Sequence, residues 1–110
     1  MKIKLKIKNK TKIINVKKCN SLQKITGLMF KSKNTKSLLF EFSKKTNMAI
    51  HSFFVFFPFY AIWLDENNRV LEIKKVKPFT FHVKPKKPYR KLIEIPINNR
   101  YKDLIKLLKA

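Results

Sequence analysis

The chain has 110 residues, 45% of them hydrophobic, which excludes a disordered protein and allows a single domain over residues 1–110 with one apolar core. Twenty-seven basic residues against six acidic ones give a formal net charge of +21, so the expected partners are polyanions, either nucleic acid or an anionic membrane surface. Cys19 is the single cysteine, which excludes an internal disulfide. The lysine-rich start lacks the apolar segment of a secretory signal, so we expect a cytoplasmic protein.

The amino-acid composition has a simple explanation that must be weighed against a functional one. All but three of the 27 basic residues are lysine, and glycine occurs once. A genome rich in A and T produces such a composition and explains abundant lysine without any function. The same bias does not explain the shortage of acidic residues to the same degree, so we expect a genuine basic surface.

Residues 2–8 alternate lysine with isoleucine or leucine. This period of two predicts a strand with its lysines on one face and its aliphatic residues on the other. A turn at residues 9–12 and a second strand from Lys12 complete a predicted hairpin. The lysine row either protects a sheet edge from pairing with another sheet or contacts phosphates, and the sequence leaves both open. The row consists of Lys2, Lys4, Lys6 and Lys8.

A short helix and a strand are predicted next. Asn20 or Ser21 is a suitable cap for a helix near residues 21–26. Gly27 can take the left-handed conformation that ends such a helix, so we expect a positive φ there. The segment "LLFEF" at residues 38–42 is predicted to be a strand.

The segment "MAIHSFFVFFPFYAIWLD" at residues 48–65 is unusually apolar. A membrane-spanning helix needs about 20 apolar residues. The apolar run here has sixteen residues and contains Pro58, so no transmembrane segment is expected. Its residues are strand formers, which predicts two strands that meet at Pro58. Because residues 53–57 are apolar on both faces, we expect Phe54 and Phe56 to be buried.

The remaining sequence predicts more strands and a terminal helix. Residues 60–64 and a strand from Arg69 form a second hairpin, followed by strands at residues 79–83 and 91–97. Behind an Asn cap, apolar residues recur at helical spacing to the end of the chain. These residues suit packing on the sheet, so contact with a membrane surface is not expected. They are Ile97, Tyr101, Leu104, Ile105 and Leu108.

Four segments occur in a characteristic order: "TGLMFK" at residues 26–31, "LLFEF" at 38–42, the apolar unit at 50–79 and "YRKLIEIP" at 89–96. In this order and spacing the chain resembles a small prokaryotic family called domain of unknown function one-ninety-two. The resemblance covers nearly the whole chain. It implies a mainly β fold, a jelly-roll-like sandwich or barrel with minor helices, and no established activity.

The sequence departs from the resembled family at two places. After Pro58 the family usually has an apolar residue and an aspartate, whereas this chain has Phe59 and Tyr60. The family commonly ends with a glycine-containing turn and a short strand, whereas this chain ends in a lysine-rich amphipathic segment. A family site that needs the aspartate or that ending is therefore in doubt here.

The residues offer little for catalysis or metal binding. Cys19, His51 and His82 have no local spacing typical of zinc sites, so no metal or cofactor is expected. No acid and base pair is evident among the carboxylates. Glu94, between two isoleucines in the resembled "EIP" motif, is the acid of most interest, and pairing with a lysine is its expected role.

Two classes of function stay open, and we lean against an enzyme. The first is a non-enzymatic module that binds RNA or another polyanion, with Phe79, Phe81 or Tyr89 as stacking partners for bases. Its predicted contacts are Lys2, Lys4, Lys6, Lys8, Lys84, Lys86, Lys87 and Arg90. The second is a small-ligand or catalytic module with an apolar pocket. Its predicted residues are Met29, His51, Trp63 and Glu94.

Overall fold

The protein is mainly β, as the sequence predicts, with a short helix at its C-terminal end. The computed structural model describes residues 1–7, 9–19, 28, 31–32, 34–52, 54–80 and 82–109. The strands are β1 (Lys2–Ile7), β2 (Lys10–Lys18), β3 (Ser37–Thr46), β4 (Phe59–Leu64), β5 (Val70–Val76) and β6 (Tyr89–Pro96). A 3-10 helix, η1 (Asn99–Tyr101), leads into α2 (Lys102–Lys109).

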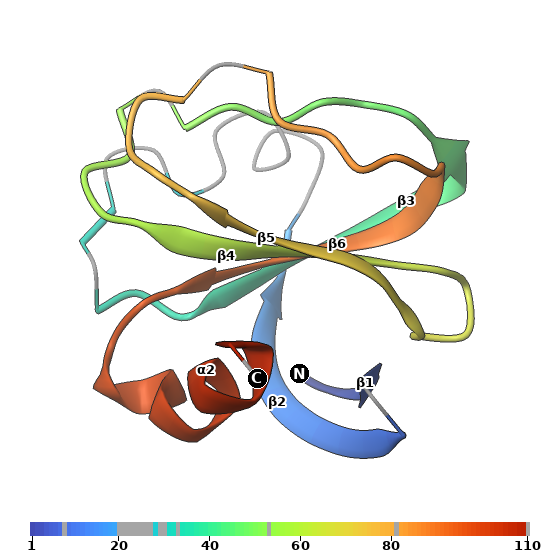
Figure 1. The fold of residues 1–110 in the computed structure, drawn as a ribbon, viewed down its shortest axis with the longest axis horizontal. Helices are drawn as coiled ribbons and strands as arrows, with labels where there is room; N and C mark the ends of the chain where they lie inside the picture. The colour runs from blue at the N-terminus through green and yellow to red at the C-terminus, as the bar shows by residue number, and fades with distance from the viewer. Residues whose placement is uncertain are drawn as a thin grey trace.

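The described residues form one six-stranded sheet with the order β1-β2-β3-β6-β4-β5. Strand β2 pairs with β3 in parallel, and all other neighbours are antiparallel. The last strand, β6, is inserted between β3 and β4, so the centre of the sheet depends on pairings between distant parts of the chain. In Figure 1 the strands β3 to β6 cross the middle of the molecule, with loops above them and the helix and first hairpin below.

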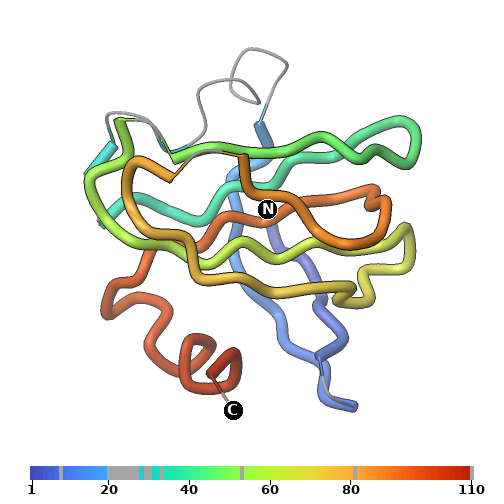
Figure 2. Tube along the Cα trace, turned by 45° about the horizontal axis from the view of Figure 1, so that its top comes forward, coloured from blue at the N-terminus to red at the C-terminus, as the bar shows by residue number. Residues whose placement is uncertain are grey.

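The sheet curls because the β1–β2 hairpin runs across the direction of the other strands, as Figure 2 shows. The curl brings the outer edge of β1 to the start of β5. There the Lys6 backbone N–H donates to Asn68 O at 3.1 Å, and Lys6 forms an isolated parallel bridge with Arg69. The two edge strands thus meet at one point. The result is a half-barrel, which confirms the predicted mainly β, barrel-like fold class.

Two apolar cores lie on opposite sides of strands β3 to β6. The hairpin core lies between the sheet, the first hairpin and α2; its buried members are Ile3, Leu5, Ile7, Ile14, Val16, Leu39, Tyr60, Ile62, Leu64, Ile93, Ile95, Tyr101, Leu104, Ile105 and Leu108. The loop core lies on the other side, beneath the long loops; its described buried members are Cys19, Leu28, Leu38, Phe40, Val55, Phe57, Phe59, Ala61, Trp63, Val76, Tyr89 and Leu92. Strand β4 supplies both cores, which is why all six of its residues are buried.

The predicted terminal helix and its cap are confirmed. The Asn98 side chain accepts a hydrogen bond from Arg100 N at 2.9 Å, which satisfies one free donor at the start of η1. Asp103 lies in the first turn of α2, where an acidic side chain complements the helix dipole. The apolar residues of α2 pack into the hairpin core. In the described part of the chain, no helix is long and apolar enough to cross a membrane.

The described residues 54–57 do not form the predicted strand, and the expected burial of two phenylalanines is wrong. Phe54 and Phe56 are 47% and 62% exposed, whereas Val55 and Phe57 are buried. A high strand propensity forms a strand only where the segment joins a sheet, and residues 54–57 lie outside the six strands of this one. The strand whose two faces are both buried is β4, which follows this segment in the sequence.

The predicted strand at residues 79–83 is also wrong. Phe79 and His82 have φ angles of 57° and 51°, which a strand does not allow. Only Val83 takes part in a bridge there among the described residues, exchanging two backbone hydrogen bonds of 2.7 Å with Ile50. The predicted helix near residues 21–26 and the positive φ of Gly27 lie outside the described residues.

Candidate nucleic-acid interface and a buried acid

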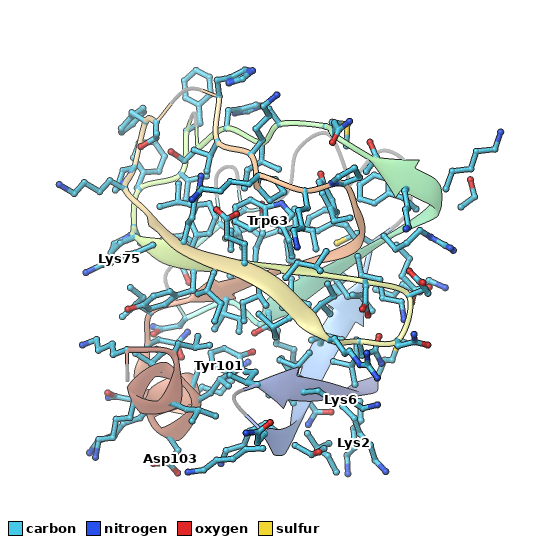
Figure 3. The ribbon with its side chains drawn as sticks, turned by 45° about the vertical axis from the view of Figure 1, so that its right-hand side comes forward. Lys2, Lys6, Trp63, Lys75, Tyr101 and Asp103 are labelled. Carbon is cyan, nitrogen blue, oxygen red and sulfur yellow. The ribbon has the colours of Figure 1, made fainter. Side chains whose placement is uncertain are left out.

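The outer face of the β1–β2 hairpin carries the predicted lysine row. Lys2, Lys4 and Lys6 are exposed, and the aliphatic residues between them are buried in the hairpin core. Their cross-strand partners are uncharged: Asn15, Ile13 and Thr11. Figure 3 shows Lys2 and Lys6 at the same corner of the molecule. Lys8 lies outside the described residues.

The hairpin itself contains no acidic residue. The first acidic residue of the sequence is Glu41, so residues 1–40 carry only positive side-chain charge. Within the described ranges one ion pair occurs, between Lys74 Nζ and a Glu72 oxygen at 3.3 Å. Burial raises the pKa of Glu72, but hydrogen bonds from Lys86 N and Lys74 outweigh burial and lower it overall. That pair lies on β5, away from the hairpin's outer face.

The second set of predicted nucleic-acid contacts lies in the loop before β6. Lys84, Lys86 and Lys87 are exposed, whereas Arg90 is only half-exposed and its Nε donates to Phe42 O at 2.9 Å. Arg90 therefore has a structural role.

The structure does not bring the loop lysines and the hairpin lysines together. The hairpin belongs to the hairpin core, and Val83 at the start of this loop packs on the loop core. In Figure 1 the loop passes above strands β3 to β6 and the hairpin lies below them. The two sets are therefore separate basic surfaces on opposite sides of the sheet.

The predicted pocket residues are only partly together. Trp63 and Glu94 are both buried, and His51 is exposed on a loop. Met29 lies outside the described residues. Trp63 pairs with Leu92 and Glu94 pairs with Ala61, so the alternation of side chains points Trp63 and Glu94 to the same face of the sheet.

Tyr89 is one of the three residues predicted to stack on bases. It is buried beside Trp63, so the prediction is wrong for Tyr89. Its ring meets the indole edge to face, with centroids 6.3 Å apart. Its hydroxyl donates to Met48 O at 2.7 Å. Burial raises the pKa of the Tyr89 phenol to about 12, so this group stays a neutral donor.

Glu94 is a buried carboxylic acid without a charged partner. It is 5% exposed, and no ion pair or hydrogen bond to its carboxyl occurs among the described residues, so the expected pairing with a lysine is wrong there. Burial raises the pKa of Glu94 to about 8. At neutral pH the carboxyl is therefore mostly protonated and can donate a hydrogen bond. Trp63 Nε1 is a second buried donor; it interacts with the Tyr89 hydroxyl, and this interaction lowers the pKa of that phenol against the larger effect of burial.

The described side chains do not assemble a catalytic or metal-binding constellation around Glu94. No group of three His, Cys, Asp or Glu residues that could hold a metal ion occurs among them. Cys19 is buried in the loop core, where its Sγ donates a weak hydrogen bond to Lys17 O at 3.7 Å. The described part of the protein thus offers neutral hydrogen-bond donors in its interior and cations on its surface.

The fold and these sites define a small β domain with a basic surface and a buried neutral acid. Residues 3–104 match the family described as an uncharacterized ACR, domain of unknown function one-ninety-two. The match covers most of the chain, so the protein belongs to this family, as the sequence segments indicate.

Curated relatives agree with this assignment, and a solved structure shares the fold. A UPF0127 protein of Pyrococcus horikoshii is 36% identical over 77 residues, which are 68% of this chain and 65% of the relative. One of Thermococcus kodakarensis is 33% identical over 78 residues, which are 69% and 49% of the two chains. The chain thus spans about half to two thirds of the relatives it matches. A crystal structure of a protein of unknown function from Novosphingobium aromaticivorans superposes with a TM-score of 0.77 at 15% identity, covering 94% of this chain and 76% of the other, and shares the fold.

The structure places the two departures from the family pattern in the same apolar core. Tyr60 stands where the resemblance implies an aspartate, and it is buried in the hairpin core together with apolar residues of α2. A tyrosine and an amphipathic helix thus occupy this side of the sheet in place of an acid.

Proposed function

We propose that this domain is a non-enzymatic module that binds a polyanion, RNA in the first place, in the cytoplasm. The observation that carries the proposal is the outer face of the β1–β2 hairpin, with three exposed lysines in a row whose cross-strand partners are uncharged. Successive outward residues on a strand lie about 6.6 Å apart, so several phosphates of one strand can be contacted together. Such contacts are independent of base sequence.

Salt dependence tests this proposal. A variant with Lys2, Lys4 and Lys6 changed to Gln should show a salt slope, log affinity against log salt, that is smaller by about 2 to 3 units, because each phosphate contact contributes about 0.7 to 0.9. The matched control changes three exposed lysines of α2 (Lys102, Lys106 and Lys109) and has the same net charge. The control should keep most of the slope.

Three results would separate the alternatives. Equal losses in both variants would mean that net charge alone acts, without a site. An unchanged slope together with self-association of the hairpin variant would favour edge protection, since β1 is an edge strand. A wild-type protein that binds no RNA at about 50 mM salt would reject the proposal.

The buried donors favour a second candidate function, binding of a small apolar ligand that carries an acceptor oxygen. Glu94 and Trp63 would supply the hydrogen bonds inside the loop core. Trp63 is the single tryptophan, so its fluorescence reports on this core directly. A saturable fluorescence change with octanoate that Glu94→Ala abolishes and Glu94→Gln retains would support this candidate; no change in the wild type would reject it.

A further inference from the structure

Ser52 joins two loops that are distant in the sequence. Its hydroxyl donates to Lys77 O and accepts from Thr80 N, both at 2.6 Å. Its backbone N–H donates to Thr80 O, and its carbonyl accepts from Phe79 N, both at 2.9 Å. Ser52 is fully buried. Residues 77–80 and the loop around Ser52 are therefore held together as one rigid unit.

This unit presents aromatic rings to solvent. Phe56 and Phe79, one from each loop, meet edge to face with centroids 5.5 Å apart, and they are 62% and 49% exposed. Phe54 is exposed beside them in sequence, and Phe54 and Phe79 have φ angles of 55° and 57°. Left-handed backbone is unfavourable for bulky residues and is found mainly where the surroundings impose it, often at functional sites. Clustered exposed apolar side chains are typical of interaction surfaces.

The two segments that carry these rings contain basic residues and no acidic ones. No acidic residue occurs in residues 42–64 or 73–93, which contain both loops. Lys77 is exposed two positions before Phe79. Aromatic rings beside lysines are typical of proteins that bind single-stranded nucleic acid, in which bases stack on rings and lysines contact phosphates.

We propose that Phe56 and Phe79, fixed by Ser52, form a stacking platform for unpaired bases of single-stranded RNA; this rests on the proposed function. A flexible strand can pass from the hairpin lysines around the half-barrel to these rings. A planar membrane cannot reach both, because they lie on opposite sides of strands β3 to β6. Bases inside a duplex are already stacked, so the platform selects single strands.

The test compares ligands with and without bases. Wild type and the double variant Phe56→Leu, Phe79→Leu are titrated with an unstructured RNA of about 16 nucleotides, the same RNA as a duplex, and inorganic polyphosphate. Stacking is worth roughly tenfold or more in affinity per base, so the variant should bind the single strand about 10- to 100-fold more weakly. Its affinity for polyphosphate and its salt slope should not change. Met48→Ala, which removes another exposed apolar side chain, is the control.

Each other outcome rejects the platform in a distinguishable way. Unchanged RNA affinity in the double variant, with RNA and polyphosphate both bound, would remove the platform and leave the basic face. Failure of the wild type to bind either ligand would remove both proposals. Sedimentation with phosphatidylserine vesicles that the same two substitutions abolish, with RNA binding intact, would assign the rings to a membrane surface instead.

Discussion

Trp63 and Glu94 are diagonal neighbours on β4 and β6 and face the same apolar core. Trp63 pairs with Leu92, and Glu94 pairs with Ala61 two positions along the ladder. A small alanine opposite Glu94 leaves the carboxyl between larger apolar side chains. The result is a neutral acid inside a protein of net charge +21, with no lysine pairing to it in the described part of the chain.

Burial of Glu94 predicts that stability falls with rising pH. Its pKa is about 8 in the folded protein and close to the ordinary 4.5 when unfolded. Between these values the folded state binds the extra proton, so the free energy of unfolding decreases as pH rises and levels off above about 8. The full effect is at most about 5 kcal/mol for this one group.

Urea unfolding followed by Trp63 fluorescence at several pH values measures this dependence. Glu94→Gln has no titrating proton and should be nearly independent of pH across the same range. Parallel pH profiles for the two proteins would show that Glu94 does not control this dependence.

Tyr101 connects η1 to β3 through a buried hydrogen bond. Its hydroxyl accepts from the Ser37 backbone N–H at 2.6 Å. Tyr101→Phe leaves that N–H without its partner, and the expected loss in the free energy of unfolding is about 1 to 3 kcal/mol. Tyr60→Phe, in the same core, is the matched control and should cost less than Tyr101→Phe. Equal losses in the two variants would contradict the role of this hydrogen bond.

Local patterns were sufficient to predict some elements of the fold. The alternation of lysines with aliphatic residues predicted β1, because a period of two can be recognised in the local sequence alone. The Asn98 cap and the helical spacing that follows predicted α2 for the same reason. The arrangement of the two basic surfaces could not be predicted, because it depends on the insertion of β6 between β3 and β4.

The candidate sites were predictable only in part. Glu94 was identified as an acid of interest from its apolar neighbours, but its protonation follows from burial by distant loops. Ser52 lies within the apolar run at residues 48–65, and nothing in the local sequence indicates its role. Its hydrogen bonds to residues 77–80 bridge 25 or more positions and leave no local pattern.

Truncation of two phenylalanines three positions apart should have very different effects on the free energy of unfolding. Phe59 is 1% exposed in β4, so Phe59→Ala should lower the free energy of unfolding by about 3 to 5 kcal/mol. Phe56 is 62% exposed, and Phe56→Ala should change it by less than about 0.5 kcal/mol. Denaturant unfolding of both variants measures the contrast. A large loss for Phe56→Ala would mean that the Phe56 side chain is buried after all.

Removal of the Ser52 hydroxyl should loosen the two loops without unfolding the sheet. Ser52→Ala deletes the hydrogen bonds to Lys77 O and from Thr80 N, and the alanine fits the same space. Loss of these buried partners should cost about 1 to 3 kcal/mol, and the cost should fall on local opening of the loops.

Amide hydrogen exchange can separate local from global effects of Ser52→Ala. The backbone N–H groups of Phe79 and Val83, which donate to Ser52 O and Ile50 O, should exchange faster. The N–H groups of β4, in the centre of the sheet, should lose much less protection. Equal loss of protection in β4 and in the loops would mean that Ser52 stabilises the whole fold. Unchanged exchange at Phe79 would mean that the Ser52 hydroxyl does not hold the loops together. The proposed aromatic platform would then lose its support.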